Sequence, residues 1–229
     1  MNTNFDYNNH TFNVQYDQGD LSGLGCIKEI VTNNEYTLDK FTNQKNKVFI
    51  DIGANLGIAT IIMAKLNPES TVYSFEPHKK TYDMLVKNIE LNSLNNVKAF
   101  NLAVSNKTNK KLNLAICHYV SGANSTYADP QLFLNQYYRF DTEIIDCISF
   151  DEIMNNNNID EVYLLKIDCE GAEFDIIYDS DLFKNKTVKN MVGEFHDLKY
   201  NKTGNKSQDL IEYCKNYVEG EFKISVLVI

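Results

Sequence analysis

The chain has 229 residues, of which 43% are hydrophobic and 23% charged, and its formal net charge is −9. The length suits one α/β domain with additions better than two independent domains, and the composition is that of a globular protein. The negative charge disfavours a surface built to bind nucleic acid or an anionic membrane. The apolar runs are all shorter than the ~18–20 residues that span a bilayer.

The five cysteines are scattered along the chain and form no C-x-x-C pair. This distribution disfavours a zinc site or a disulfide framework and fits reduced thiols in a cytosolic protein. The first ten residues, MNTNFDYNNH, lack the basic start and the apolar stretch of a signal peptide. We therefore expect a cytoplasmic protein whose partner is neither nucleic acid nor a membrane.

Residues 1–46 are rich in Asn and other polar side chains. Hydrophobic residues alternate in one short segment, at Phe12, Val14 and Tyr16, and a helix is predicted over Leu24–Phe41. We expect residues 1–46 to form an N-terminal extension that packs on a main domain of residues 47–229.

From Lys47 onward, short apolar runs alternate with helical patterns. The expected strands are KVFIDIG, TVYSFEP, NVKAFNLAV, KLNLAIC, DTEIIDCISF, Val162–Asp168, Val188–His196 and KISVLVI. The expected helices are 58–65, 79–92, 150–154, 172–182 and 208–217. This alternation predicts a doubly wound, mostly parallel, Rossmann-like α/β sheet. Ligands bind such sheets beyond the carboxyl ends of the strands.

The first of these strands ends in DIGANLG. Gly53 and Gly57 allow a close approach of the backbone to a ligand, and the helix that follows presents unpaired N–H groups. Asp51 stands where a dinucleotide fingerprint has its first glycine. A carboxylate there suits the positive charges of S-adenosylmethionine (SAM) better than a diphosphate. The missing G-x-G-x-x-G disfavours an NAD-dependent oxidoreductase.

The second strand ends in FEP, and Glu76 follows Asp51 by 25 residues (76 − 51). In Rossmann-like folds an acid near this spacing accepts hydrogen bonds from the ribose hydroxyls. Pro77 then ends the strand. The glycine loop and this acid together predict a site for a nucleoside cofactor.

Six segments in this order resemble the FkbM-type SAM-dependent methyltransferases: FIDIGANLG, YSFEP, NLAVSN, ISFDEIM, LLKIDCEGAEFDII and GEFH. The resemblance covers about Lys47 to His196, and K-I-D-x-E-G-A-E is its most specific mark. It implies a class I methyltransferase sheet with strand order 3-2-1-4-5-7-6. The chain departs from that pattern at the last hairpin, because it stops about where a sixth strand is expected.

The resemblance also implies the roles of individual residues around SAM. Gly53 and Gly57 hold the backbone against the methionine part, in a loop fixed by Asp51 and Asn55, and Glu76 takes the ribose. The end of the third strand lies beside the adenine, although the acid that usually bonds the adenine amino group is missing there. The expected cofactor residues are Asp51, Gly53, Ala54, Asn55, Gly57, Glu76, Pro77, Asn101, Leu102, Ala103 and Asp168.

Four candidate catalytic residues end two strands that we expect to be neighbours: Asp168 and Glu170, then Glu194 and His196. Adjacent parallel strands bring these ends to one rim, and a histidine suits a general base. The alternative is that Glu194 and His196 only bond loops. A divalent metal held by all four is a further alternative, which we do not expect. For Glu173, stabilising the helix dipole and a part in catalysis both remain open.

We expect O-methylation of a hydroxyl on a sugar, a glycan or a small metabolite, a preference that rests on the resemblance. Residues 119–139 are a candidate lid or acceptor loop, because aromatic faces suit sugar rings; the alternative is a surface excursion. Alternative functions are methylation of nitrogen, protein or another acceptor, and a non-catalytic module that binds SAM or a nucleotide. The acids at both strand ends disfavour the module.

Overall fold

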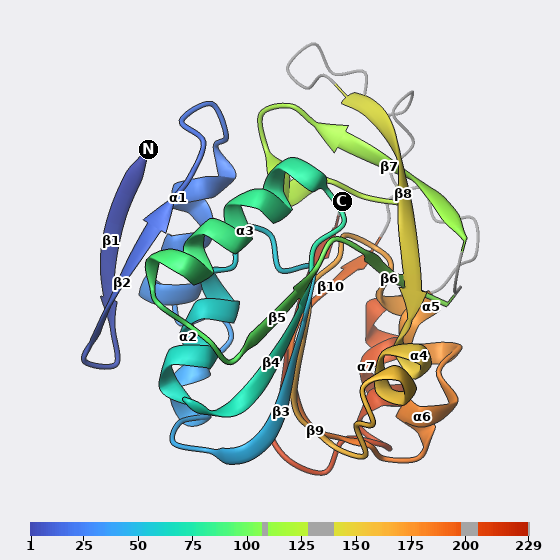
Figure 1. Ribbon diagram of the computed structural model, residues 1–229. Coiled ribbons are helices and arrows are strands. Elements are labelled where there is room, and N and C mark those ends of the chain that lie inside the picture. Colours follow the sequence, from blue (N-terminus) through green and yellow to red (C-terminus); the bar gives the residue numbers. More distant parts are fainter. Residues whose placement is uncertain (107–109, 128–139, 198–205, 229) are drawn as a thin grey trace.

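The computed structural model describes residues 1–106, 110–127, 140–197 and 206–228 (Figure 1). Its centre is a six-stranded sheet in the order β11-β10-β9-β3-β4-β5, in which every neighbouring pair is parallel. The strands are β3 (Lys45–Ile52), β4 (Glu69–Phe75), β5 (Val97–Phe100), β9 (Val162–Ile167), β10 (Val188–Asp197) and β11 (Phe222–Val228). The parallel α/β sheet predicted from the alternation of patterns is confirmed.

Helices cover both faces of this sheet (Figure 1). On one side lie α2 (Ile58–Leu66) and α3 (Lys79–Leu91); on the other lie α4 (Phe150–Asn156), α5 (Glu173–Tyr178), α6 (Asp181–Lys184) and α7 (Ser207–Cys214). Successive strand side chains point to opposite faces. Phe49 therefore joins the core under α2, whereas Ile50 joins the core under α4–α7, and both are fully buried. A strand buried on both faces reads as the continuous apolar run seen in the sequence.

The N-terminal residues form an antiparallel hairpin of β1 (Asn2–Tyr7) and β2 (His10–Gln15). The hairpin lies against α3, whose Asn88 and Asn92 side chains accept hydrogen bonds from the backbone N–H groups of Gln15 (2.6 Å) and Asn13 (3.0 Å). These amides satisfy backbone groups of the edge strand that no neighbouring strand reaches.

The single helix predicted over Leu24–Phe41 is wrong. The chain forms α1 (Ser22–Ile27), a π-helical turn (Lys28–Thr32) and a 3-10 turn (Leu38–Lys40). Asn34 and Thr37 between them have positive φ values of 52° and 45°, which an α-helix does not allow.

Two other predicted elements are divided in the structure. The run NVKAFNLAV forms β5 and then β6 (Ala103–Ser105), which belongs to a separate sheet with β7 (Lys111–Cys117) and β8 (Phe140–Ser149). The helix predicted over 172–182 is split into α5 and α6, because Ser180 accepts a hydrogen bond from the Phe183 N–H and starts a new helix. A hydrophobic pattern alone does not mark such breaks.

The sheet ends with β11, which follows α7 and pairs in parallel directly with β10. The order β5-β4-β3-β9-β10 reproduces the 3-2-1-4-5 part of the pattern implied by the resemblance, and the departure expected at the last hairpin is this parallel strand. Among the residues that the structure describes, no helix combines the length and the apolar character needed to cross a membrane.

Candidate active site

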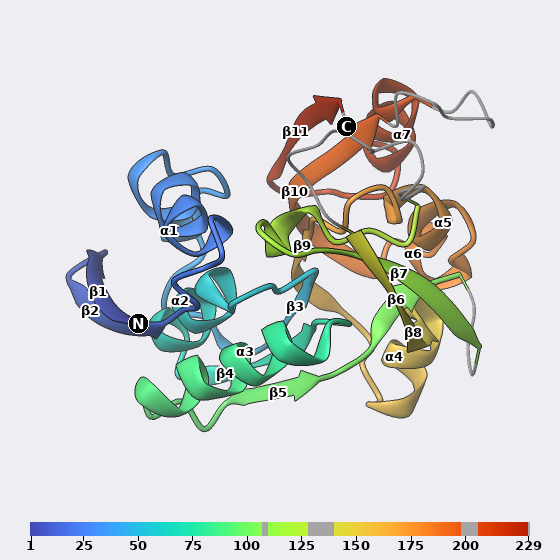
Figure 2. The same cartoon turned by 90° about the horizontal axis from the view of Figure 1, so that it is seen from above.

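The carboxyl ends of the central strands open into a cavity of about 700 Å³. The loop after β3 contributes Gly53–Asn55, and the ends of β9 and β10 contribute Asp168, Glu170 and Glu194. The remaining walls come from segments far away in the chain, which include α1, the turn Val120–Ala123 and β11. Seen from above, α1 and β11 lie on different sides of the sheet end (Figure 2).

A second, smaller cavity of about 70 Å³ adjoins the first, and four residues line both: Gly53, Gly122, Asp168 and Glu170. The smaller cavity is lined by the ends of β4 and β5 and the start of β6, which place there four of the residues expected around the nucleoside: Glu76, Pro77, Leu102 and Ala103. After the roles that the sequence predicts for their residues, we call these spaces the acceptor compartment (700 Å³) and the nucleoside compartment (70 Å³).

Gly53 sits where the loop after β3 crosses the end of β9. Its φ is 74°, and a Cβ atom there would lie 1.7 Å from the backbone oxygen of Asp168. Only glycine tolerates both the backbone conformation and this approach. Gly57, with φ 84°, precedes α2, and Asn55 between the two glycines also has positive φ (50°).

Glu76 is buried at the end of β4, and both of its carboxylate oxygens accept hydrogen bonds. One accepts from the backbone N–H of Asn55 and the other from that of His78, each at 2.9 Å. Burial raises the pKa of Glu76 to about 7, although the two N–H groups oppose the shift. Glu76 therefore ties the glycine loop to the second strand and faces the nucleoside compartment.

Asn101, another residue expected at the cofactor, uses its side chain to hold backbone. Its amide donates to the carbonyl oxygens of Glu76 (2.9 Å) and Pro77 (2.8 Å). These two bonds tie the segment between β5 and β6 to the end of β4, and Leu102 and Ala103 of this segment line the nucleoside compartment.

Asp51 is fully buried beneath the glycine loop. One carboxylate oxygen accepts from the Thr60 hydroxyl at 2.5 Å, and the other lies 3.2 Å from the Lys166 ammonium. Lys166 also donates to the Gly53 carbonyl (2.7 Å) and lies 3.8 Å from Asp168. Burial lowers the pKa of Lys166, but Asp51 and Asp168 outweigh burial and raise it. A buried ion pair thus connects Asp51 to the glycine loop through Lys166.

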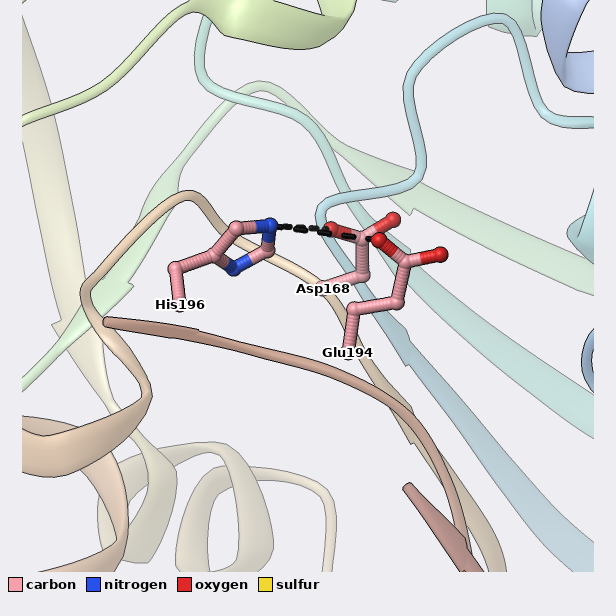
Figure 3. Close-up of side chains that lie close together, drawn as sticks. All are labelled: Asp168, Glu194 and His196. Atoms are coloured by element: carbon pink, nitrogen blue, oxygen red, sulfur yellow. Dashed lines mark ion pairs between the residues drawn. The ribbon is translucent and has the colours of Figure 1, made fainter. Parts of the chain in front are cut away.

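Asp168, Glu194 and His196 point toward one another at the rim of the sheet (Figure 3). The Nε2 atom of His196 lies 3.9 Å from Asp168 Oδ1, 3.9 Å from Glu194 Oε2 and 3.7 Å from Glu170 Oε2. The structure therefore brings together all four residues that the sequence predicted to meet. His196 is fully buried, behind the three carboxylates that line the acceptor compartment.

Glu173 is fully buried rather than solvated, and it anchors this cluster from below. It accepts hydrogen bonds from the N–H groups of Cys169 (2.9 Å) and Gly171 (3.0 Å), and its Oε1 lies 2.9 Å from His196 Nδ1. Burial lowers the pKa of His196, but the hydrogen bond to Glu173 and the charges of Glu170 and Asp168 outweigh it and raise this pKa to about 10.

Glu170 occupies an unusual backbone position between the two compartments. Its φ is 55°, a conformation that costs a side-chain-bearing residue of order 1–3 kcal/mol and is concentrated at functional sites. Its carbonyl accepts a hydrogen bond from the Ser125 hydroxyl at 2.5 Å. Burial raises the pKa of Glu170 to about 8, and burial together with the nearby Asp168 raises that of Glu194 to about 7.

Several residues of the site escaped the sequence analysis. Tyr36 donates to Asp168 Oδ2 at 2.8 Å from within the N-terminal segment, and Glu29 and Glu35 add charge to the acceptor compartment. Lys166 could have been predicted from the sequence, because it is the first residue of the K-I-D motif. Tyr36 carried none, because 132 residues separate it from its partner.

The segment proposed as a lid, 119–139, is described as far as Tyr127, and residues 128–139 lie outside the described residues. The described part lies over the glycine loop. The Ser121 hydroxyl donates to Asn55 Oδ1 (3.1 Å), and the Gly122 N–H donates to the Ser22 hydroxyl (2.9 Å). It thereby connects the first strand end to the N-terminal segment.

Comparisons with known proteins matched one family model and several relatives. The family model described as the methyltransferase FkbM domain matches residues 51–218. Methyltransferase 1 of Beauveria bassiana is 27% identical over 186 residues, which cover 75% of this chain and 73% of the relative. Methyltransferase sdnD of Sordaria araneosa is 26% identical over 193 residues, with 73% and 72% covered.

Among solved structures, TYW2 of M. jannaschii in complex with AdoMet is 24% identical, with a TM-score of 0.27 over 48% of this chain and 52% of that one. This chain therefore spans about half of that solved protein. The FkbM match takes in both strand ends that carry the acids, whereas α1, Tyr36 and β11 lie outside it.

Proposed function

The chain belongs to the FkbM methyltransferase family, and on that premise we propose that it transfers the methyl group of SAM to a hydroxyl oxygen of a sugar, a glycan or a small metabolite. One observation carries the proposal. The glycine loop and the acids at the ends of β9 and β10, both inside the family match, border a single cavity.

We place SAM across the two compartments. Glu76 would accept hydrogen bonds from its ribose hydroxyls, and Leu102 and Ala103 would lie beside its adenine; all three residues border the nucleoside compartment. Its methionine part follows Gly53, Ala54 and Asn55, which border the acceptor compartment. The sulfonium then lies near Asp168 and Glu170, which border both spaces, and their negative charge favours a cationic cofactor.

The transfer itself is an in-line displacement. A lone pair of the acceptor oxygen forms the new O–C bond, and the C–S bond breaks with its electron pair remaining on sulfur, which gives S-adenosylhomocysteine. The acceptor oxygen also loses its proton, and a positioned carboxylate accelerates such a step by about 10²–10⁴-fold. We assign that role to Glu170, which borders both compartments.

His196, which the sequence suggested as the base, is assigned a positioning role. Its ring is buried behind the carboxylates, and Glu173 holds Nδ1. Asp168 and Glu194 line the rim next to Glu170, and Tyr36 orients Asp168.

The lining of the acceptor compartment supports a neutral acceptor. Among the described residues that line it, five are acids (Glu29, Glu35, Asp168, Glu170 and Glu194) and Lys166 is the one base. Such a lining repels phosphates and other anions, which disfavours nucleic acid. The volume of about 700 Å³ falls in the range of about 300–1,000 Å³ common for small-molecule sites. Hydroxyl groups of a sugar or a similar metabolite match both properties.

In this proposal the domain of residues 47–229 binds SAM and the acceptor, and two further segments help to enclose the acceptor. The N-terminal extension, residues 1–46, supplies one wall of the acceptor compartment through Ser22, Cys26 and Tyr36. Residues 119–139 act as a lid or acceptor loop, of which Ser121 and Gly122 already contact the other walls.

The test is a screen of the purified chain with SAM and a panel of sugars and hydroxylated metabolites, read by mass spectrometry. We expect one O-methylated product in a one-to-one ratio with S-adenosylhomocysteine. Glu170→Gln should lower kcat at least about 100-fold, whereas Glu90→Gln, an exposed acid on α3, should not. Methylation of nitrogen in place of oxygen would contradict the proposed acceptor, and binding of NAD but not SAM would contradict the cofactor.

A further inference from the structure

Three different donor atoms converge at the floor of the acceptor compartment: Asp168 Oδ1, Glu194 Oε2 and His196 Nε2 (Figure 3). These residues can each offer one ligand atom such that all three atoms lie within 4.8 Å of one another. Ligand atoms about 2.1 Å from a metal ion lie roughly 3 Å apart at right angles and roughly 4 Å apart on opposite sides. Short side-chain rotations therefore bring the three atoms onto one ion.

The His196 Nε2 atom has no hydrogen-bond partner among the described residues, although its side chain is fully buried. Its distances to the facing carboxylates, 3.7–3.9 Å, exceed the 2.7–3.2 Å of a direct hydrogen bond. A buried polar atom without a partner destabilises the fold, so native structures rarely leave one unused. An ion between Nε2 and the two carboxylates satisfies all three groups at once.

The opposite nitrogen of the same ring is already held. With Nδ1 bonded to Glu173 Oε1 at 2.9 Å, Nε2 faces Asp168 and Glu194, and a metal ion that binds there replaces the Nε2 proton. Glu173 is itself fixed by the N–H groups of Cys169 and Gly171. A histidine whose second nitrogen donates to a carboxylate is the usual arrangement of a metal ligand.

The charges around the three donor atoms also favour the binding of a cation. Five carboxylates surround two basic groups. Asp51 and Asp168 lie 3.2–3.8 Å from the Lys166 ammonium. Asp168, Glu170, Glu173 and Glu194 lie 2.9–3.9 Å from the His196 ring. Lys166 lies nearer to Asp51 (3.2 Å) than to Asp168 (3.8 Å) and donates to Gly53. It therefore leaves Glu170 and Glu194 with His196 as their nearest basic group.

We propose that Asp168, Glu194 and His196 bind one first-row divalent cation such as Mn²⁺, with its free coordination positions open to the acceptor compartment. The nitrogen ligand favours such an ion over Mg²⁺ or Ca²⁺, which prefer oxygen. The consequence for the substrate rests on the proposed function. Acceptor oxygens complete the coordination, the ion lowers the pKa of the attacking hydroxyl, and acceptors with two adjacent oxygens are preferred. The proton of that hydroxyl passes to Glu170, which is not a ligand.

The experiment titrates the full chain, stripped of metal with EDTA and dialysed, with Mn²⁺ alone and follows free Mn²⁺ by its electron paramagnetic resonance signal. We expect one bound ion per chain. Glu194→Gln and His196→Gln should each weaken binding at least about tenfold, since each removes one of three ligands. Glu29→Gln removes an acid from the same compartment at an exposed position, and its affinity for Mn²⁺ should stay within about twofold of the parent.

The buried His196→Gln variant requires a check of its fold by thermal melting, and the near-isosteric Glu194→Gln variant provides a second measurement. No binding of Mn²⁺ to the parent chain, or equal binding by the ligand variants and Glu29→Gln, overturns the metal site. SAM binding measured by calorimetry in EDTA separates the two proposals. SAM binding and full methyl transfer without metal leave the proposed function intact and contradict the role of the ion in the transfer. A chain that binds Mn²⁺ but not SAM contradicts only the proposed function.

Discussion

The nucleoside and acceptor compartments share walls but are built in different ways. The nucleoside compartment is lined by strand ends and the short segments that follow them, such as Glu76 and Pro77 after β4 and Leu102 and Ala103 after β5. The acceptor compartment adds α1, Tyr36 and β11, which lie outside the part of the chain that matches the FkbM family.

Because the two compartments are built differently, we expect one to recognise the cofactor and the other to recognise the acceptor. The residues around the nucleoside hold backbone in place through hydrogen bonds between neighbouring strand ends, as Glu76 and Asn101 do. The acceptor walls are supplied by segments that approach one another only after folding, so their identity can change without disturbing the glycine loop. We infer that cofactor binding resides in the family match and that acceptor choice resides largely outside it.

The largest effect is expected for Gly53→Ala, which tests the cofactor-binding glycine loop. The new Cβ atom would lie 1.7 Å from the Asp168 carbonyl at a φ of 74°, so the loop or β9 must move. We expect the affinity for SAM, measured by calorimetry, to fall by more than about 100-fold. Gly25→Ala is the matched control, because Gly25 also lines the acceptor compartment and its added Cβ meets no atom within 4 Å. Equal SAM binding by both variants would refute the role of Gly53.

The second largest loss of SAM affinity is expected for Glu76→Ala. The substitution removes the acceptor of the Asn55 and His78 N–H groups and, in our proposal, of the ribose hydroxyls. Loss of charge-assisted bonds worth about 1.5–3 kcal/mol predicts SAM binding roughly 10- to 100-fold weaker. An unchanged dissociation constant would show that the nucleoside lies elsewhere.

The pH dependence of SAM binding also tests whether Glu76 binds the ribose. The pKa of Glu76 is raised to about 7, and ribose hydroxyls donate best to the ionised carboxylate. SAM should therefore bind more tightly as the pH rises from 6 to 8, by up to about tenfold per unit below the pKa. The stability of the unliganded chain changes in the opposite sense. A raised pKa contributes stability below the unfolded value near 4.5, and this contribution is lost as the pH rises through about 7.

Calorimetry at pH 6, 7 and 8 measures this dependence. Glu76→Gln, whose amide does not ionise in this range, should bind SAM with a flatter pH profile. The same slope in the parent and in Glu76→Gln would assign the titration to another group.

Tyr36→Phe tests the acceptor side, where smaller effects are expected. The change removes one hydrogen bond to Asp168 and leaves the ring in its buried place. We expect kcat to fall roughly three- to tenfold, with SAM affinity nearly unchanged. Tyr7→Phe is a comparable control, because the Tyr7 hydroxyl bonds Asn34 and Asp39 away from both compartments. A loss of SAM affinity equal to that of Glu76→Ala would remove the distinction between the two compartments.

The smallest effect is expected for Glu29→Gln. Removing one exposed charge from the wall should change the KM of a neutral acceptor by about twofold or less and leave SAM affinity unaltered. A decrease in KM of tenfold or more, measured by steady-state kinetics, would indicate an anionic acceptor and contradict the proposed class.

The sequence predicted the parallel sheet and the strand ends that carry the site residues, because both depend on local patterns. Val162–Ile167 is apolar except for Lys166 because both faces of β9 are buried, and Gly53 is a glycine because of its backbone angle. Breaks within apolar runs were less predictable. The division of NVKAFNLAV depends on Asn101 bonding the carbonyls of Glu76 and Pro77, which belong to another strand.

By itself, the sequence determined that Asp168, Glu170, Glu194 and His196 end neighbouring strands, because the register of parallel strands follows from their hydrophobic pattern. Only the tertiary structure decided how these groups are used. It buried Glu173 under His196, aimed Nε2 at two carboxylates and brought Tyr36 onto Asp168. Such contacts depend on side-chain directions and on loop closure across many residues, and a local pattern carries no record of either.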